Sequence, residues 1–263
     1  MVASPAPDAA VLAPHAGLLG LALAVLFLPS APRWLREWLP IIALPILYSE
    51  IPALIAAHGH VATNDAVVLR WEHMVFGGDP SRAWAAKWAW LPMSEVLHAS
   101  YLSYYAIVFS VPAALAFTGR RNELGVATFV LLLTFITCFL LYSVFPVDGP
   151  RYGSVTPIPG MMRAAVLWVL ENGSSRGTAF PSSHVAVATT QSILAVWYFG
   201  RRGVAVGALT VALAAGAVYG GFHYAVDAVA GVALGVGISA VGLGLMGATR
   251  RKPSDQANAT APT

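Results

Sequence analysis

Two residues near the carboxyl end of the chain, His223 and Asp227, have types and a spacing that suit nucleophilic or acid–base chemistry. They are four residues apart, so they share one face if this segment is helical. The carboxylate can then accept the Nδ1 hydrogen of the imidazole and leave Nε2 free as a nucleophile or a base. A polar pair that only satisfies itself at a membrane boundary would have the same spacing.

A second histidine, His184, ends the run Phe180-Pro181-Ser182-Ser183-His184. Proline followed by two serines is typical of a helix start, where a serine caps the helix and the first N–H groups are free to bind an oxyanion. We therefore expect Ser182 and Ser183 to contact phosphate near His184. Ordinary capping beside an interfacial histidine is the alternative interpretation.

The third polar group is Asp148-Gly149-Pro150-Arg151-Tyr152. A turn of this kind ends a helix and presents Arg151, whose planar guanidinium can bind two phosphate oxygens at once. An arginine that only anchors lipid headgroups would fit the same position. Arg176 is a weaker candidate for binding phosphate.

The composition indicates that most of this chain is surrounded by lipid. Hydrophobic residues make up 57% of the 263 positions and charged residues 10%, which no soluble domain of this length needs to fill a core. We predict an all-α, polytopic bundle of about seven transmembrane spans, because a helix needs about 20 apolar residues to cross the hydrocarbon. The predicted spans are 14–30, 38–57, 98–118, 123–146, 185–200, 203–221 and 225–247.

The distribution of basic residues predicts the orientation, since short cytoplasmic loops retain Lys and Arg. Nine of the fifteen basic residues lie on alternate connections and in the tail: Arg33, Arg36, Arg120, Arg121, Arg201, Arg202, Arg250, Arg251 and Lys252. We expect a multi-pass protein of the plasma (inner) membrane with a cytoplasmic carboxyl terminus. The three polar groups then lie together at the extracytoplasmic face, where the outer ends of the fourth to seventh spans converge.

Four regions are predicted along the chain: an external tail (1–13), two accessory spans (14–57), a catalytic membrane domain (58–248) and a disordered cytoplasmic tail (249–263). The outer segments 58–97 and 147–184 are rich in Trp, Gly and Pro, as suits interfacial helices. The single cysteine, Cys138, falls inside an apolar run, so neither a disulfide nor a thiol metal site is expected.

The polar groups resemble the signatures of the type 2 phosphatidic acid phosphatase superfamily. Pro181-Ser182-Ser183-His184 is followed, 39 residues after its histidine, by His223 with Asp227 four residues further on. The order and the helical placement agree with the second and third signatures of that superfamily. The resemblance extends over about residues 65–245.

This resemblance implies a role for each matching residue. His223 would take the phosphoryl group, Asp227 would orient it, and His184 would protonate the leaving alcohol, while Arg151 would hold phosphate. The substrate would be a membrane lipid, and water or an alcohol such as a polyol would be the acceptor. No cofactor, metal or nucleic acid is expected, because two histidines with one carboxylate lack a second acidic ligand and a phosphohistidine route needs no ion.

Within the superfamily, three stretches resemble the inositol phosphorylceramide synthase branch: Phe76-Gly77-Gly78-Asp79-Pro80, the run from Ser94 to Tyr101, and Gly149-Pro150-Arg151. Five residues in or near these stretches and the third signature are candidates for lining the pocket: Asp79, Glu95, His98, Tyr152 and Tyr224. Asp79, Glu95 and His98 also suit helix starts: capping is the favoured interpretation for Asp79 and an equal one for Glu95 and His98.

The sequence departs from the phosphatase signatures at three positions. Val144 stands seven residues before Arg151 in place of a lysine, Ala217 stands six residues before His223 in place of an arginine, and Ser183 replaces a glycine. The loss of two cations fits a diester of lower charge, so we predict a lipid phosphotransferase. The alternatives are a lipid phosphate phosphatase, a degenerate inactive site, and a non-catalytic transporter or receptor, which would carry charges along a central pathway.

Overall fold

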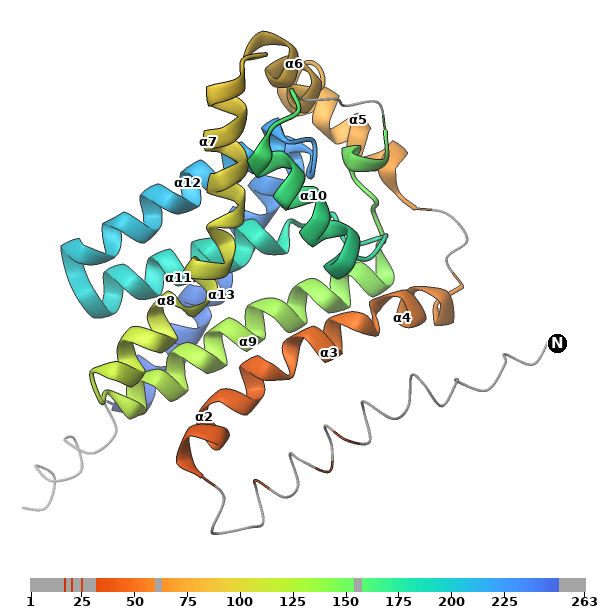
Figure 1. Ribbon diagram of the computed structural model, residues 1–263. Helices are drawn as coiled ribbons and strands as arrows, with labels where there is room; N and C mark the ends of the chain where they lie inside the picture. Colours follow the sequence, from red (N-terminus) through yellow and green to blue (C-terminus); the bar gives the residue numbers. More distant parts are fainter. Residues whose placement is uncertain are drawn as a thin grey trace, which may run out of the picture.

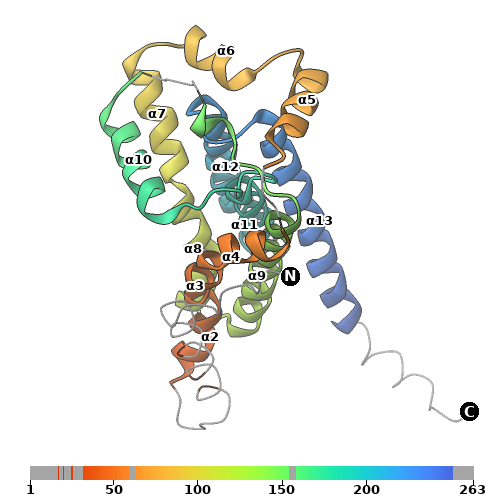
Figure 2. The same ribbon diagram turned by 90° about the vertical axis from the view of Figure 1, so that its right-hand side faces the viewer.

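The computed structural model describes residues 32–59, 63–153 and 158–250, with the isolated positions 17, 20 and 25. These residues form helices joined by turns and loops, and they contain no β-strand beyond one isolated bridge between Val147 and Thr178. The predicted all-α membrane fold is confirmed (Figures 1 and 2). The predicted first span (14–30), apart from those three positions, and the segments 1–13 and 251–263 lie outside the described residues.

The first half of the described chain contains α2 (Arg33–Ile42), α3 (Leu44–Ser49), α4 (Ile51–Ala57), α5 (Asp65–Phe76), α6 (Pro80–Lys87), α7 (Leu91–Leu102), α8 (Tyr104–Phe117) and α9 (Arg121–Val144). The second half contains the 3₁₀ turn η1 (Pro150–Tyr152), α10 (Met161–Gly173), α11 (Ser183–Phe199), the 3₁₀ turn η2 (Gly200–Gly203), α12 (Val204–Tyr219) and α13 (Ala225–Arg250).

Four described segments are long and apolar enough to cross a membrane: Leu91–Phe117, Arg121–Val144, Ser183–Tyr219 and Ala225–Leu245. The third of them folds back at η2, because Thr210 of α12 donates to the Ala188 carbonyl and its hydroxyl lies 2.7 Å from that of Ser192 in α11. The predicted spans 185–200 and 203–221 are therefore the two arms of one hairpin.

The segment predicted as a single span at 38–57 is broken instead. It begins earlier, at Arg33, and its two parts, Arg33–Ser49 and Ile51–Ala57, meet at 48°. Pro45 and Pro52 stand within the first two positions of α3 and α4. Proline lacks the N–H that would continue the preceding helix and its ring clashes with the carbonyl four residues earlier, so each proline starts a new helix.

The span predicted to begin at residue 98 begins at Leu91. Two polar side chains that had suggested a boundary lie inside α7, where each has a hydrogen-bond partner, although Oε1 of Glu95 has none among the described residues. Glu95 accepts the Met162 N–H at 3.0 Å, and the fully buried His98 lies 2.6 Å from the Ser94 carbonyl and 3.4 Å from the Arg163 guanidinium. Because Met162 and Arg163 of α10 provide these partners, Glu95 and His98 can lie within α7 instead of at its start.

Helix α11 is the centre of the bundle, with α8, α9, α12 and α13 packed around it (Figure 2). Two glycines of α13 permit the closest of these contacts. An added Cβ would lie 2.6 Å from the Ser182 carbonyl oxygen at Gly231 and 2.5 Å from the Ala186 carbonyl oxygen at Gly235. Small residues at such positions let backbones approach in membrane bundles, and here they fix α13 against the histidine-bearing start of α11.

Charged side chains gather toward the two ends of this bundle. At one end, Arg121 pairs with Glu37 of α2 at 2.5 Å, and Arg120 donates to the Tyr198 carbonyl at the end of α11. Helices α5, α6 and α10 lie at the other end and along one side (Figure 1). The structure thus brings together three of the basic connections that were predicted to share one membrane face.

Candidate active site

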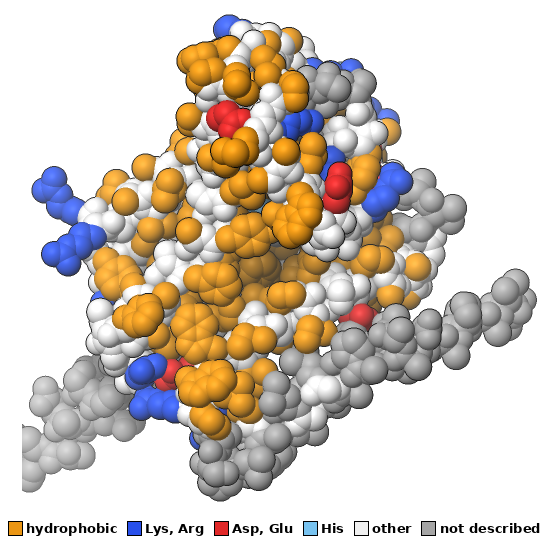
Figure 3. Space-filling model, in the orientation of Figure 1, with side chains coloured by type: hydrophobic (Ala, Val, Ile, Leu, Met, Phe, Trp, Pro, Cys, Tyr) orange, Lys and Arg blue, Asp and Glu red, His pale blue; other side chains and the backbone are white. Residues whose placement is uncertain are grey.

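A cavity of about 310 Å³ opens among α3, α8, α9 and α10 and ends at His184 and His223. Arg151 and Ser183 also line its polar end. The remainder is mostly apolar or aromatic, with side chains that include Ile41, Leu44, Tyr104, Val108, Phe135 and Phe139. Figure 3 shows this face of the molecule covered by hydrophobic side chains and hollowed near its centre. The cavity therefore joins a polar end with two imidazoles to an apolar interior.

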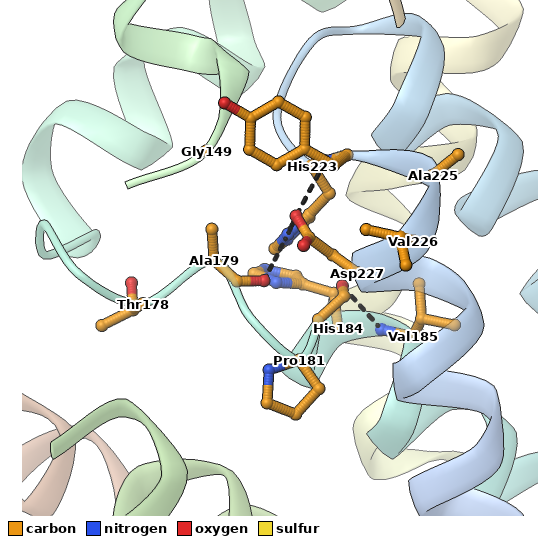
Figure 4. Close-up of polar contacts among 12 residues, drawn as sticks. Gly149, Thr178, Ala179, Pro181, His184, Val185, His223, Ala225, Val226 and Asp227 are labelled. Atoms are coloured by element: carbon orange, nitrogen blue, oxygen red, sulfur yellow. Dashed lines mark hydrogen bonds and ion pairs between the residues drawn. The ribbon is translucent and has the colours of Figure 1, made fainter. Parts of the chain in front are cut away.

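His223 lies in the turn between α12 and α13 and is 4% exposed. Its Nδ1 is 3.0 Å from the carbonyl oxygen of Ala179 and 3.6 Å from Oδ2 of Asp227 (Figure 4). The prediction that Asp227 accepts the Nδ1 hydrogen is wrong in this geometry, because the backbone carbonyl occupies that position. A carbonyl can only accept, so Nδ1 carries the hydrogen and Nε2 presents its lone pair.

Asp227 is fully buried in the first turn of α13. Its Oδ2 accepts the Tyr224 N–H at 2.8 Å, which holds the turn that carries His223. Its Oδ1 has no hydrogen-bond partner within the described part of the chain. At 3.6 Å from Nδ1, the carboxylate is close enough to stabilise a positive charge on the imidazole.

Ala179 is held in place by the segment that follows α9. Its N–H donates to the Val147 carbonyl at 2.7 Å, and the Val147 N–H donates to the Gly177 carbonyl at 3.2 Å. Gly149 has φ of +83°, and a Cβ there would lie 2.9 Å from the Ala179 Cβ. Only glycine adopts this conformation and permits this approach without strain, so Gly149 sets the position of the carbonyl that orients His223.

His184 faces His223 from the start of α11, with 5.7 Å between the ring centroids. Two tyrosines of the third predicted span surround it. The hydroxyl of Tyr101 lies 3.3 Å from Nε2 of His184, and the centroid of the Tyr104 ring lies 4.3 Å from the centroid of the imidazole. Figure 4 shows both imidazoles beside the Ala179 carbonyl. The two histidines are close enough to act on the two sides of one phosphorus centre.

The N–H groups at the start of α11 are less free than predicted. The Ser183 N–H donates to the Tyr142 hydroxyl at 3.1 Å, and the Val185 N–H donates to the Ser182 Oγ at 3.4 Å. Tyr142 in turn donates to the Pro181 carbonyl at 2.9 Å. Ser182 is therefore a buried helix cap, and only Ser183 of the two serines lines the cavity.

The two candidate arginines have different surroundings. Arg151 lines the cavity, and its Nη1 lies 3.5 Å from the Leu170 carbonyl. Arg176 is exposed, does not line this cavity, and pairs with the carboxylate of Asp148. The same carboxylate accepts the Gly177 N–H at 2.8 Å. Arg151, and not Arg176, therefore lines the same cavity as the two histidines.

The five further pocket candidates do not line the cavity that holds the histidines. Asp79 caps α6 by accepting the Arg82 N–H, as the capping interpretation expected. Asp79, Tyr152 and Tyr224 line a second hollow of about 340 Å³. Glu95 and His98 face α10 instead. The sequence did not predict this, because the position of a residue in a helix does not show which neighbouring element its side chain will face.

Several residues around the site were not among the sequence candidates. The backbone carbonyl of Ala179 leaves no mark in the sequence, since every residue type has one. Tyr101 and Tyr142 are ordinary aromatic residues of apolar helices until their hydroxyl partners are seen. Glu72 has a signal in the sequence, because it lies seven residues after Asp65 and shares one helical face with it; the structure shows that this carboxylate is fully buried.

A family model described as the PAP2 superfamily matches residues 61–241, which is more than half of the 263 residues. A comparison with curated proteins finds no match. The chain is similar to a solved structure described as the first transmembrane PAP2 type phosphatidylglycerolphosphate phosphatase from Bacillus subtilis. The identity is 18%, the match covers 80% of this chain and 99% of that chain, and the TM-score is 0.48.

Proposed function

Because the chain belongs to the PAP2 superfamily, we propose that it is a membrane-embedded lipid phosphotransferase that acts through a phosphohistidine on His223. The observation that carries this proposal is the geometry of that imidazole. Its Nδ1 hydrogen is directed at the Ala179 carbonyl at 3.0 Å, so Nε2 is the nucleophilic atom, and His184 is its neighbour in the cavity. A nucleophile of fixed tautomer beside a second proton-carrying group is the arrangement that covalent transfer requires.

In the first step, Nε2 of His223 attacks the lipid phosphorus while the bond from phosphorus to the lipid alcohol oxygen breaks. Protonated His184 gives its proton to the departing alcohol. In the second step, neutral His184 takes the proton of an acceptor alcohol, whose oxygen attacks phosphorus and releases His223. Asp227 stabilises the charge on the phosphorylated imidazole.

The charges around the cavity favour a phosphodiester substrate, as in the inositol phosphorylceramide synthase branch. Among the described residues that line the cavity, Arg151 is the one cation and Asp148 the one acid, and the Asp148 carboxylate is already paired with Arg176 outside the cavity. Ala217 is fully buried in an apolar cluster with Tyr101 and Phe222, where an arginine would not fit without repacking. One guanidinium balances the single charge of a diester better than the double charge of a phosphate monoester.

The apolar part of the cavity suits the hydrocarbon chains of the lipid. Its aromatic and aliphatic walls come from α2, α3, α8 and α9 and leave the phosphorus end to the histidines. We place this end at the extracytoplasmic face, because the arginine-containing connections gather at the opposite end of the bundle. The finer assignment of plasma membrane and cytoplasmic carboxyl terminus belongs to the same proposal.

The test is a comparison of products. The purified full-length protein in lipid nanodiscs receives phosphatidylinositol labelled in its headgroup, or labelled phosphatidic acid, with and without a panel of alcohol acceptors that includes glycerol and a short-chain ceramide. We expect the labelled group on the added alcohol, and no product with His223→Ala. Rapid release of inorganic phosphate from phosphatidic acid, with no acceptor product at any alcohol concentration, would make the protein a phosphatase. No turnover of either lipid would favour a non-catalytic role.

A further inference from the structure

Helix α5 carries two carboxylates that the proposed reaction does not use. Asp65 and Glu72 are seven residues apart with Val68 between them, and this spacing places the three side chains on one face of the helix. That face packs directly onto the site, because Val68 is fully buried in a cluster that also contains Val147 and Tyr224.

Glu72 holds the segment that carries His223. Its side chain is fully buried, and its two oxygens accept the N–H groups of Ala225 at 2.9 Å and Val226 at 2.8 Å. These are the first two N–H groups of α13, and they lie between His223 and Asp227 in the chain. A carboxylate at this position satisfies donors that a helix start leaves free and interacts favourably with the helix dipole.

Asp65 holds the turn that presents Arg151. Its Oδ2 accepts the Asp148 N–H at 2.9 Å, and its Oδ1 accepts the Gly149 N–H at 2.8 Å. The same Oδ1 accepts the Tyr224 hydroxyl at 3.3 Å, which links this turn to the start of α13. Both carboxylates of α5 therefore bind backbone N–H groups on the two segments that meet at the cavity.

We propose that Asp65 and Glu72 are positioning residues: through the rigid helix between them, they fix the Arg151 turn relative to the His223 segment. This inference rests on the proposed function. Seven residues of α-helix rise about 10 Å, so α5 keeps its two attachment points at a set separation. A displacement of about 1 Å between a nucleophile and the group it attacks can cost about 100-fold in rate.

The two carboxylates are expected to affect different kinetic constants. Glu72 acts on the attacking imidazole, so its loss should lower kcat and leave KM nearly unchanged. Asp65 acts mainly on the turn that holds phosphate, so its loss should raise KM more than it lowers kcat. A residue that only stabilised the fold would lower the amount of active protein and with it the apparent kcat, so kcat is expressed per folded protein, and hydrogen exchange gives the folded fraction.

The experiment uses the full-length protein in lipid nanodiscs, with phosphatidylinositol and the alcohol acceptor that gives turnover in the wild type. The variants are Glu72→Gln, Glu72→Asp and Asp65→Asn, and Glu171→Gln on the exposed surface of α10 is the matched control. Glutamine keeps the length of the side chain and one accepting oxygen, whereas aspartate keeps the charge and cannot reach both N–H groups. We expect kcat to fall about 10-fold with glutamine and about 100-fold with aspartate, and Glu171→Gln to match the wild type.

Hydrogen exchange gives a readout that is independent of activity. Loss of the Glu72 contacts should speed exchange in peptides that contain Ala225 and Val226, while Asp65→Asn should speed exchange at Asp148 and Gly149. Exchange in α9, which neither carboxylate touches, should not change. This measurement also shows whether each variant is folded, so a loss of activity in an unfolded protein is recognised.

Three results would overturn the positioning roles while the wild type remains active. They are unchanged kcat and KM in the α5 variants, more activity with Glu72→Asp than with Glu72→Gln, and equal exchange at the four amides in variant and wild type. More activity with aspartate would mean that charge and not hydrogen-bond geometry matters. A wild-type protein that transfers no phosphoryl group from any lipid would instead overturn the proposed function, and this inference with it.

Discussion

The Nδ1 atom of His223 lies 3.0 Å from the carbonyl oxygen of Ala179 and 3.6 Å from the carboxylate of Asp227. The backbone of a neighbouring loop, and not the acid one helical turn away, therefore fixes the tautomer of the imidazole. Because the Asp227 carboxylate also accepts the Tyr224 N–H at 2.8 Å, it orients the turn and supplies charge. One acid usually both fixes the tautomer of a catalytic histidine and stabilises its positive charge. Here the Ala179 carbonyl fixes the tautomer and the Asp227 carboxylate supplies the charge.

This division predicts the effect of a change at Gly149, where an added Cβ would meet the Ala179 Cβ and the Phe222 carbonyl oxygen. Gly149→Ala forces a side chain into a left-handed conformation and against the Ala179 Cβ at 2.9 Å. We expect the backbone strain to destabilise the protein by about 1–3 kcal/mol and activity to fall further, since the Ala179 carbonyl must move. Thermal unfolding and turnover are measured together. Gly207→Ala is the control, because an added Cβ in α12 meets nothing within 4 Å; equal effects of both changes would contradict the prediction.

Arg151 and Arg176 should differ sharply when each is replaced by alanine. A hydrogen bond to a charged group contributes about 1.5–3 kcal/mol, so Arg151→Ala should lower kcat/KM by about 10- to 100-fold. Arg151→Lys should recover only part of this, because an ammonium cannot bind two phosphate oxygens in the same plane. Arg176 is exposed and paired with Asp148, so Arg176→Ala should stay close to the wild type. Similar losses in both alanine variants would show that the cavity is not the phosphate site.

Glu72 predicts a pH dependence of stability. Burial raises the pKa of this carboxyl above its ordinary value of 4.5, although the Ala225 and Val226 N–H groups offset part of the rise. An acid with a raised pKa binds its proton more tightly in the folded state, so the wild type loses stability as the pH rises from below 4.5 through the raised value.

Glu72→Gln has no group that titrates there. The Tm of the variant minus the Tm of the wild type should therefore increase between about pH 4 and pH 7. This holds even if the variant has the lower Tm at every pH because it has lost hydrogen bonds. Thermal unfolding of both proteins across this range tests the sign. Glu171→Gln, on the exposed surface of α10, is measured alongside as the control. A Glu72→Gln difference that is flat, or that falls as the pH rises, would contradict a raised pKa of Glu72 in the folded protein.

The proposed orientation can be tested with single cysteines, because the one native cysteine, Cys138, is buried. Glu171→Cys in α10 should react with a membrane-impermeant maleimide in intact cells. Arg201→Cys in η2 should react only after the membrane is permeabilised, since basic loops are cytoplasmic. Labelling of Arg201→Cys in intact cells would reverse the orientation, and the proposed location of the site would change with it.

The residues that could be located from the sequence are those whose spacing is local. His223 and Asp227 are four residues apart and His184 follows a proline-serine helix start, so short-range rules suffice to place them at helix ends. Pro45 and Pro52 are local signals of the same kind, because a proline favours a helix start, and they divide the predicted span 38–57 into separate helices. The start of α7 was missed because Glu95 and His98 find partners on α10, a contact that the local sequence does not show.

The supporting contacts could not be predicted because they join distant segments through the backbone. Glu72 meets Ala225 and Val226 across more than 150 positions of the chain, and the N–H groups it accepts exist at nearly every residue. The pair Asp65 and Glu72 on one helical face was visible as a pattern. An amphipathic helix at the membrane surface would produce the same pattern, so only the packing of α5 distinguishes the two.

The roles of the two histidines can be separated by the leaving group. His223→Ala should lose all activity, including activity on a substrate with an activated leaving group such as p-nitrophenol. His184→Ala should keep a measurable fraction on that substrate while losing the natural one, because an activated alcohol needs no proton to depart. Asp227→Asn should fall between them. Equal residual activity of the two alanine variants on the activated substrate would be inconsistent with these roles.

The central claim is that His223 carries the phosphoryl group, and the direct measurement is acid-labile phosphate trapped on the protein from lipid labelled at phosphorus. After rapid quenching at alkaline pH, wild type and His184→Ala with the activated substrate should retain label, and a peptide containing His223 should hold it. His223→Ala should retain none. Label that persists in His223→Ala and disappears in His184→Ala would show that the roles are reversed, and an active wild type that never holds label under any quench would contradict the phosphohistidine mechanism itself.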